Sequence, residues 1–110
     1  MKQNKVLYNV TVVVDPSIHD EWKQWMIQNH IPDMMATGCF TEYKMSLILG
    51  SEAENGLNYA IQYVAPSMDV FLKYRDQYST SLQKEHQIRY KDRYASFRTV
   101  MEIHDEGQAL

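Results

Sequence analysis

Apolar and polar residues alternate at the start of the chain, in the pattern of a half-buried β-strand. Every second residue of Val6–Val14 is apolar, while the intervening positions include Asn9 and Thr11. One side of this strand is therefore expected to face a core. Asp15 and Pro16 come next, and they suit a helix N-cap and a first helical position. The pattern predicts a strand over Val6–Val14 followed directly by a helix.

A helical spacing of apolar residues replaces this alternation over Ile18–Met26, so the first helix is expected to bury one face. Pro32 lacks an amide hydrogen and restricts the residue before it, which is expected to end that helix near His30. A second, short helical segment is predicted over Asp33–Thr37, with Gly38 just beyond its end.

Strand-like alternation and helical spacing of apolar residues both recur in the rest of the chain. A polar turn, Gly50–Gly56, closes with Asn-Gly and predicts a hairpin. A second helical region is expected to open at Ala65–Ser67. Ser79–Ser81 is expected to break or re-cap it, since Thr80 and Gln83 have capping-box spacing. Three more strands are predicted, at Phe40–Leu49, Leu57–Val64 and Tyr94–Ile103.

The resulting order is βαββαβ, which with right-handed crossovers gives a ferredoxin-like α+β sandwich with a four-stranded antiparallel sheet. Residues 1–110 are expected to form a single domain, with a core over residues 6–103 and a loose polar tail over 104–110. Both helical regions should cover one face of the sheet. The other face is left open.

The open face is expected to be too apolar to meet water alone, because it carries residues such as Leu7, Val13 and Val64 among polar ones. We place Asn9, Gln62 and Arg98 on this face, on neighbouring strands. A second copy of the chain is the commonest cover for such a surface, so a homodimer is expected.

Asn9, Gln62 and Arg98 are the first candidate ligand-binding group. Two amides and a guanidinium could orient a carbonyl or carboxylate substrate, or stabilise a developing oxyanion. The same side chains could instead form cross-strand or interface hydrogen bonds. The sequence leaves both interpretations open.

His30 and His86 are the candidate histidines. His30 could face a cavity and act as a base, or it could cap the first helix as an imidazolium. His86 lies on the second helical region and is expected to pack, partly buried, against the sheet; it is also a candidate ligand-binding residue. We take His30 and Arg98 as the candidate catalytic pair.

Composition excludes several classes of function. The 110 residues are 45% hydrophobic with a formal net charge of −3, which argues against nucleic-acid binding through the phosphate backbone. No apolar run is long enough for a membrane span. The histidines have no metal-binding spacing, and a single cysteine, Cys39, has no partner for an intramolecular disulfide. We expect no metal, no cofactor and a cytoplasmic location.

Four segments carry a resemblance to known proteins, and together they span most of residues 6–103. The chain resembles a family of short uncharacterised bacterial proteins and, more distantly, the dimeric α+β barrel superfamily, chiefly through topology and the His-x-Pro at His30. The segments are LYNVTV (Leu7–Val12), WKQWMIQNHIPDMMATG (Trp22–Gly38), YAIQYVAPS (Tyr59–Ser67) and SFRT (Ser96–Thr99).

The resemblance implies a fold and a dimer but no single reaction. Superfamily members include cofactor-independent monooxygenases, haem-degrading enzymes and proteins without known chemistry. Haem-degrading members pair a histidine on the second helix with an asparagine on the first strand, positions that His86 and Asn9 could occupy. Those members also have a strand-three tryptophan, which this chain lacks.

Two functions from different classes follow. The first is a dimeric protein that binds or transforms a small aromatic or carbonyl metabolite without a cofactor. The second is a non-catalytic dimerisation or interaction module. The sequence does not settle whether the chain is an enzyme.

Overall fold

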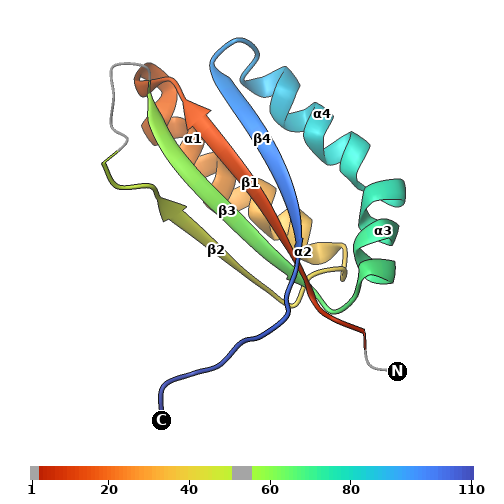
Figure 1. Ribbon diagram of the computed structural model, residues 1–110. Coiled ribbons are helices and arrows are strands. Elements are labelled where there is room, and N and C mark those ends of the chain that lie inside the picture. The colour runs from red at the N-terminus through yellow and green to blue at the C-terminus, as the bar shows by residue number, and fades with distance from the viewer. Residues whose placement is uncertain (1–2, 51–55) are drawn as a thin grey trace.

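The computed structural model describes residues 3–50 and 56–110 and has a ferredoxin-like α+β fold (Figure 1). Four antiparallel strands form one sheet in the order β2-β3-β1-β4, which places β1 and β3 at its centre. The predicted element order is confirmed. The strands are β1 (Val6–Val14), β2 (Glu42–Leu47), β3 (Leu57–Ala65) and β4 (Tyr94–Glu102).

The helices pack on one face of the sheet and leave the other open (Figure 1). A 3-10 turn and a π-helical turn flank the first helix of the chain, and a second pair of helices follows β3. In chain order these elements are the 3-10 turn Pro16–Ile18, α1 (His19–Trp25), the π turn Met26–His30, α2 (Ile31–Ala36), α3 (Met68–Gln77) and α4 (Ser79–Arg89). None of the described helices is long and apolar enough to cross a membrane.

The strand register decides which side chains face the helices. Val10 of β1 lies opposite Ile61 of β3 and opposite Arg98 of β4, and directly paired residues share a face. The predicted inward sides of β1 and β3 are confirmed, because most of the side chains there are buried: Val6, Tyr8, Val12 and Val14 of β1, and Tyr59, Ile61 and Tyr63 of β3. The core lies between these two strands and the helices.

The prediction for β4 was wrong by one residue in register. Tyr94, Ser96 and Arg98 lie opposite Val14, Val12 and Val10 and therefore face the helices, while Phe97 and Met101 lie on the open face. β4 is an edge strand, and its helix-facing side is only partly covered: Arg98 and Val100 remain exposed there. Polar residues are therefore tolerated on the helix-facing side of β4, although the sequence pattern assigned them to the open face.

Pro32 changes the helix without breaking it. The expected stop near His30 is absent, because the chain passes from α1 through the π turn directly into α2. The amide of Ile31 donates to the carbonyl of Met26, five residues back, which widens the turn at the point where Pro32 has no amide to donate. His30 is the last residue of this wider turn.

Two further local predictions concern the start of α4 and the turn before β3. The expected break at Ser79–Ser81 is present, because α3 ends at Gln77 and α4 begins at Ser79. The Thr80–Gln83 capping box does not form: α4 has no side-chain cap, and Ser79 Oγ donates to the carbonyl of Arg75. The predicted Asn-Gly hairpin turn falls largely on residues 51–55, outside the described residues. Residues 104–110 are exposed and extend away from the sheet, as expected for the tail (Figure 1).

Candidate functional site

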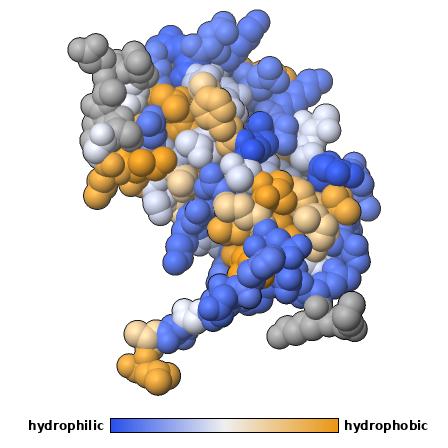
Figure 2. Space-filling model, viewed as in Figure 1, coloured by the Kyte–Doolittle hydropathy of each residue, from blue (hydrophilic) through white to orange (hydrophobic). Residues whose placement is uncertain are grey.

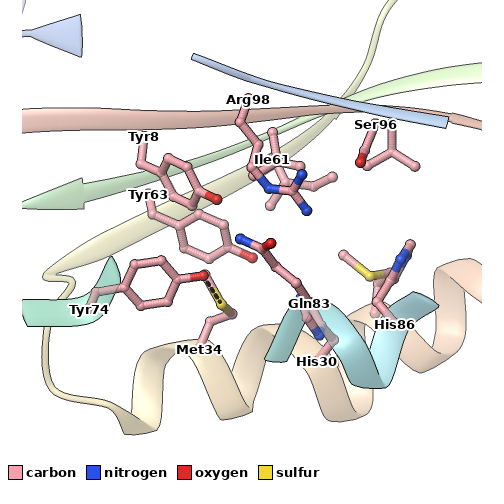
Figure 3. A pocket seen from close by; sticks show the side chains of 13 residues that line it. Tyr8, His30, Met34, Ile61, Tyr63, Tyr74, Gln83, His86, Ser96 and Arg98 are labelled. Carbon is pink, nitrogen blue, oxygen red and sulfur yellow. Dashed lines mark hydrogen bonds between the residues drawn. The ribbon is translucent and has the colours of Figure 1, made fainter. Parts of the chain in front are cut away.

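A small pocket lies between the sheet and the helices, near the middle of β1 (Figure 3). Its volume is about 30 Å³, which is room for only one or two water molecules. Aromatic and sulfur-containing side chains form most of its wall. Its polar lining residues are Tyr8, His30, Tyr63, Tyr74, Gln83, His86, Ser96 and Arg98.

Arg98 supplies the only charge among the residues that line this pocket. Its side chain projects from β4 toward Gln83 of α4 and the tyrosines of the central strands (Figure 3). Among residues 3–50 and 56–110, no carboxylate forms an ion pair with it. The pocket therefore has a positive electrostatic potential within a chain whose net charge is −3.

Both pocket histidines are uncharged near neutral pH. Burial lowers the pKa of His30 to about 4, with Asp33 opposing the shift and Arg98 adding to it. Burial also lowers the pKa of His86 to about 3, with further contributions from His30 and Arg98. The two rings lie 5.7 Å apart between centroids. A neutral His30 cannot be the imidazolium cap that one interpretation of the sequence required.

His86 is held in one tautomer. The indole Nε1–H of Trp22 donates to Nε2 of His86 over 2.9 Å, so the proton of the neutral ring lies on Nδ1. The ring also packs edge-on against Tyr94, with centroids 4.1 Å apart. His86 was expected to pack, partly buried, against the sheet; it packs against Tyr94 of β4 and is buried.

His30 is less constrained. It stacks on Trp25 with centroids 5.2 Å apart, and its buried Nδ1 has no hydrogen-bond partner within the described part of the chain. His30 is therefore a buried polar group of this pocket with unused hydrogen-bonding capacity.

Phenolic hydroxyl groups provide hydrogen-bond donors opposite Arg98. Those of Tyr8 and Tyr63 point toward the cavity (Figure 3), whereas that of Tyr74 donates to the sulfur of Met34 over 3.4 Å. Burial raises the pKa of Tyr63 and of Tyr74 well above the usual value for tyrosine. The hydroxyl groups of Tyr63 and Tyr74 therefore stay protonated. As donors beside Arg98, the hydroxyl groups of Tyr8 and Tyr63 favour an oxygen acceptor in the pocket.

The structure brings three of the five predicted site residues together and separates the other two. His30, His86 and Arg98 line the same pocket. Asn9 and Gln62 are paired with each other on the open face, so the prediction that they share a surface with Arg98 was wrong. The cause is the register of β4, which turns Arg98 toward the helices.

Sequence reasoning missed Tyr8, Tyr63 and Gln83 as pocket residues. Both tyrosines fell in inward-facing registers and were assigned to the core, because pattern alone does not show where a hydroxyl group meets a void. Gln83 had a detectable signal: Ser79, Gln83 and His86 recur with helical spacing, which places a polar stripe on the side of α4 facing the sheet.

A shallow groove continues from the pocket toward α3. It has a volume of about 390 Å³ and shares Tyr8, Tyr74, Gln83 and Arg98 with the pocket. Its remaining walls are mostly apolar. They come from Met68, Phe71 and Leu72 of α3, Val100 of β4, and the polar residues Arg75 and Ser79.

The open face of the sheet is mixed in character, and Figure 2 shows hydrophobic side chains interleaved with hydrophilic ones. Phe97 is 64% exposed and Met101 38% exposed on this side. At its centre Asn9 Nδ2 donates to Thr11 Oγ1, while the buried Asn9 Oδ1 has no partner among the described residues. The corrected register makes this face more apolar than the sequence indicated.

Metal coordination has no support in the described residues. No three His, Cys, Asp or Glu side chains come together there as a possible metal site. Cys39 is buried, and its Sγ donates to the carbonyl of Thr37.

Solved structures with the same fold share little sequence with this chain. A dimeric ferredoxin-like protein from an uncultured marine organism has a TM-score of 0.77 at 7% identity, covering 96% of this chain and 100% of that one. The hydroxynitrile lyase of Passiflora edulis has a TM-score of 0.68 at 15% identity, covering 96% and 98%.

A dimeric ferredoxin-like protein of unknown function from Thermobifida fusca has a TM-score of 0.59 at 13% identity, covering 94% of this chain and 95% of that one. At these identities the likeness shows the fold alone. None of the curated proteins compared with the chain is significantly similar to it.

A family model is more specific than these structures. The model described as a domain of unknown function, DUF4286, matches residues 5–104, a range that includes all four strands, all the helices and every residue that lines the pocket. The resemblance to an uncharacterised family is thereby confirmed, and the chain belongs to the DUF4286 family.

Proposed function

We propose that this protein binds a small metabolite bearing a carbonyl or carboxylate group, whose oxygen atoms lie against Arg98 in the pocket between sheet and helices. The observation that carries the proposal is a guanidinium with no ion-pair partner among the described residues, in a pocket whose lining contains no acidic residue. Arg98 is exposed, so its charge is accessible to an incoming anion. A ligand with a negative or strongly polarised oxygen supplies the missing partner.

The rest of the lining supports the same class of ligand. Hydroxyl donors of Tyr8 and Tyr63 stand on one side of Arg98, and neutral His30 and His86 on the other. The pocket has room only for the oxygen-bearing group, so an apolar or aromatic body next to it would lie in the adjoining groove, whose walls are mostly apolar.

Proton transfer is the chemistry that these residues could add to binding. His30 is neutral and its Nδ1 is unpartnered, so it is able to accept a proton from a bound compound. An anion at Arg98 would raise the pKa of His30, because it offsets the positive charge that now contributes to lowering that pKa. In this scheme Arg98 stabilises the oxyanion and His30 is the base.

Binding is tested with benzoate and benzamide, which differ in charge but scarcely in shape. We expect benzoate to bind more tightly, and Arg98→Gln to weaken benzoate binding by about tenfold or more, since a charged hydrogen bond contributes about 1.5–3 kcal/mol. Dissociation constants come from titrations followed by amide chemical shifts.

Arg75→Gln is the matched control, because Arg75 lies beside the same opening but is paired with Asp76 at 2.9 Å. Equal affinities of the wild-type and Arg98→Gln proteins for benzoate would refute the assignment of Arg98.

We also propose that two copies of the chain associate through their open sheet faces. Phe97, Met101 and the buried, unpartnered Asn9 Oδ1 support this arrangement, since a second copy would cover the first two and offer a donor to the third. Two solved structures with this fold are described as dimeric. In a purely non-catalytic module this dimer would be the whole function, and the benzoate titrations would show no binding.

A further inference from the structure

We infer that the ligand is an amphiphilic monocarboxylate, with its carboxylate at Arg98 and an unbranched apolar chain lying in the groove between α3 and β4. This inference rests on the proposed function, because it uses the same guanidinium to hold the head group. It adds where the rest of the molecule lies and what chemistry it has.

The two volumes require a ligand that extends out of the pocket. The inner pocket has about 30 Å³ of space, which suits a group no larger than a carboxylate or a water or two. The groove has about 390 Å³, which falls within the usual range for a small-molecule site. A compound larger than the inner pocket must therefore place its body in the groove.

Arg98 stands at the junction of the two spaces. It lines both the pocket and the groove, together with Gln83 on α4 and Tyr8 and Tyr74. Figure 3 shows the guanidinium and the Gln83 amide projecting toward one another from opposite walls. A head group bound there would have polar side chains on its inner side and the groove on its outer side.

The groove has an apolar character that matches an alkyl chain. Met68 is 38% exposed and Val100 45% exposed, and Phe71 and Leu72 also line the groove. No acidic residue lines the groove, and Arg75 is already paired with Asp76. Charge complementarity thus favours an anion at the inner end, and apolar surface favours a chain at the outer end.

The experiment measures affinity along a homologous series, from acetate through butyrate and hexanoate to octanoate, with octanol as the uncharged counterpart. Titrations are followed by amide chemical shifts of the full chain. Each added methylene that the groove covers is expected to tighten binding about fourfold, and octanol is expected to bind more weakly than octanoate.

Two substitutions of the same residue type separate the groove from the rest of the surface. Met68→Gln places a polar amide in the groove and should flatten the dependence on chain length while leaving acetate affinity unchanged. Met101→Gln is the matched control, because Met101 is also 38% exposed but lies on the open face. It should preserve the full dependence.

The outcomes distinguish this inference from the function on which it rests. If all four carboxylates bind through Arg98 with equal affinity, the chain does not occupy the groove and the inference is overturned, while the proposed function stands. If neither benzoate nor any aliphatic carboxylate binds, both are overturned. If Arg98→Gln leaves octanoate affinity unchanged, the placement of the head group is wrong.

Discussion

Burial keeps two imidazole groups uncharged beside a permanent cation. His30 and His86 lie within one pocket with Arg98, and each neutral ring avoids a repulsion that its protonated form would meet. The arrangement is stable at neutral pH because the usual pKa of histidine is 6.5, so deprotonation costs little there. At acidic pH the free-energy cost of keeping both rings neutral should rise.

His30 is expected to make the protein sensitive to acid. Its pKa is about 4 in the folded state against a usual value of 6.5, so between these values the unfolded chain takes up a proton that the folded chain refuses. Stability contributed by His30 is complete above pH 6.5 and is lost as the pH falls toward 4, by at most about 3 kcal/mol. Urea unfolding of wild type and His30→Gln at pH 7 and pH 4 measures the difference.

His104→Gln is the control for this comparison, because His104 lies on the exposed tail. The His30→Gln protein should lose less stability on acidification than wild type, whereas His104→Gln should lose as much. Identical acid sensitivity of wild type and His30→Gln would show that His30 titrates normally in the folded protein.

Single residues were predicted unevenly. His30, His86 and Arg98 were recognised because ionisable side chains stand out among apolar ones, and the structure places all three at the pocket. Tyr8 and Tyr63 were not recognised as pocket residues, since a tyrosine at an inward-facing position is normally interpreted as a core residue. Whether its hydroxyl group meets another side chain or a void depends on three-dimensional packing that no linear pattern contains.

At the scale of the element, the entry into β3 depends on a glycine. Gly56 has φ +137, and a Cβ atom built there would lie 2.4 Å from the carbonyl oxygen of Val14. The obstacle is backbone of the central strand β1, which cannot move aside cheaply.

Gly56→Ala is therefore expected to lower the free energy of unfolding by about 2–3 kcal/mol. Gly107→Ala, on the tail with open space around it, should change it by less than about 0.5 kcal/mol. Thermal and urea unfolding give both values. Equal stabilities of the two variants would mean that β1 and β3 separate locally without cost.

The elements themselves were largely predictable, and the exceptions have physical causes. β1 and β3 are central strands with one side buried, so their alternation was clear. β4 is an edge strand, and both of its sides are partly exposed. Its two sets of alternating side chains differ too little in polarity for the sequence to show which set faces the helices. Pro32 was expected to end a helix, but the π turn accommodates its missing amide.

At the scale of the whole molecule, the open sheet face is expected to hold a dimer together. Phe97→Glu would place a charge among apolar side chains on that face and should raise the dimer dissociation constant more than tenfold, as for a central interface residue worth about 2 kcal/mol. Light scattering coupled to gel filtration measures the mass. Ile88→Glu is the control, because Ile88 is 70% exposed but lies on α4.

A wild-type protein that is monomeric at high concentration would contradict the proposed dimer. A dimer that withstands Phe97→Glu but not Ile88→Glu would place the interface on the helices. The overall architecture was predictable because six alternating elements with short connections admit few topologies. The pocket was not predictable, because its shape depends on how α4 packs across β4.

β4 has a consequence for how this protein could be altered. Its even-numbered residues face the helices and its odd-numbered residues face the open side of the sheet. Adjacent residues of β4 therefore pack in different environments. Under the proposed function, substitutions at Ser96 or Val100 are expected to change ligand selectivity without affecting the dimer contact, and substitutions at Phe97 or Thr99 to change the dimer contact without affecting selectivity. The nine residues of this strand therefore form two sets of positions that can be substituted independently of each other.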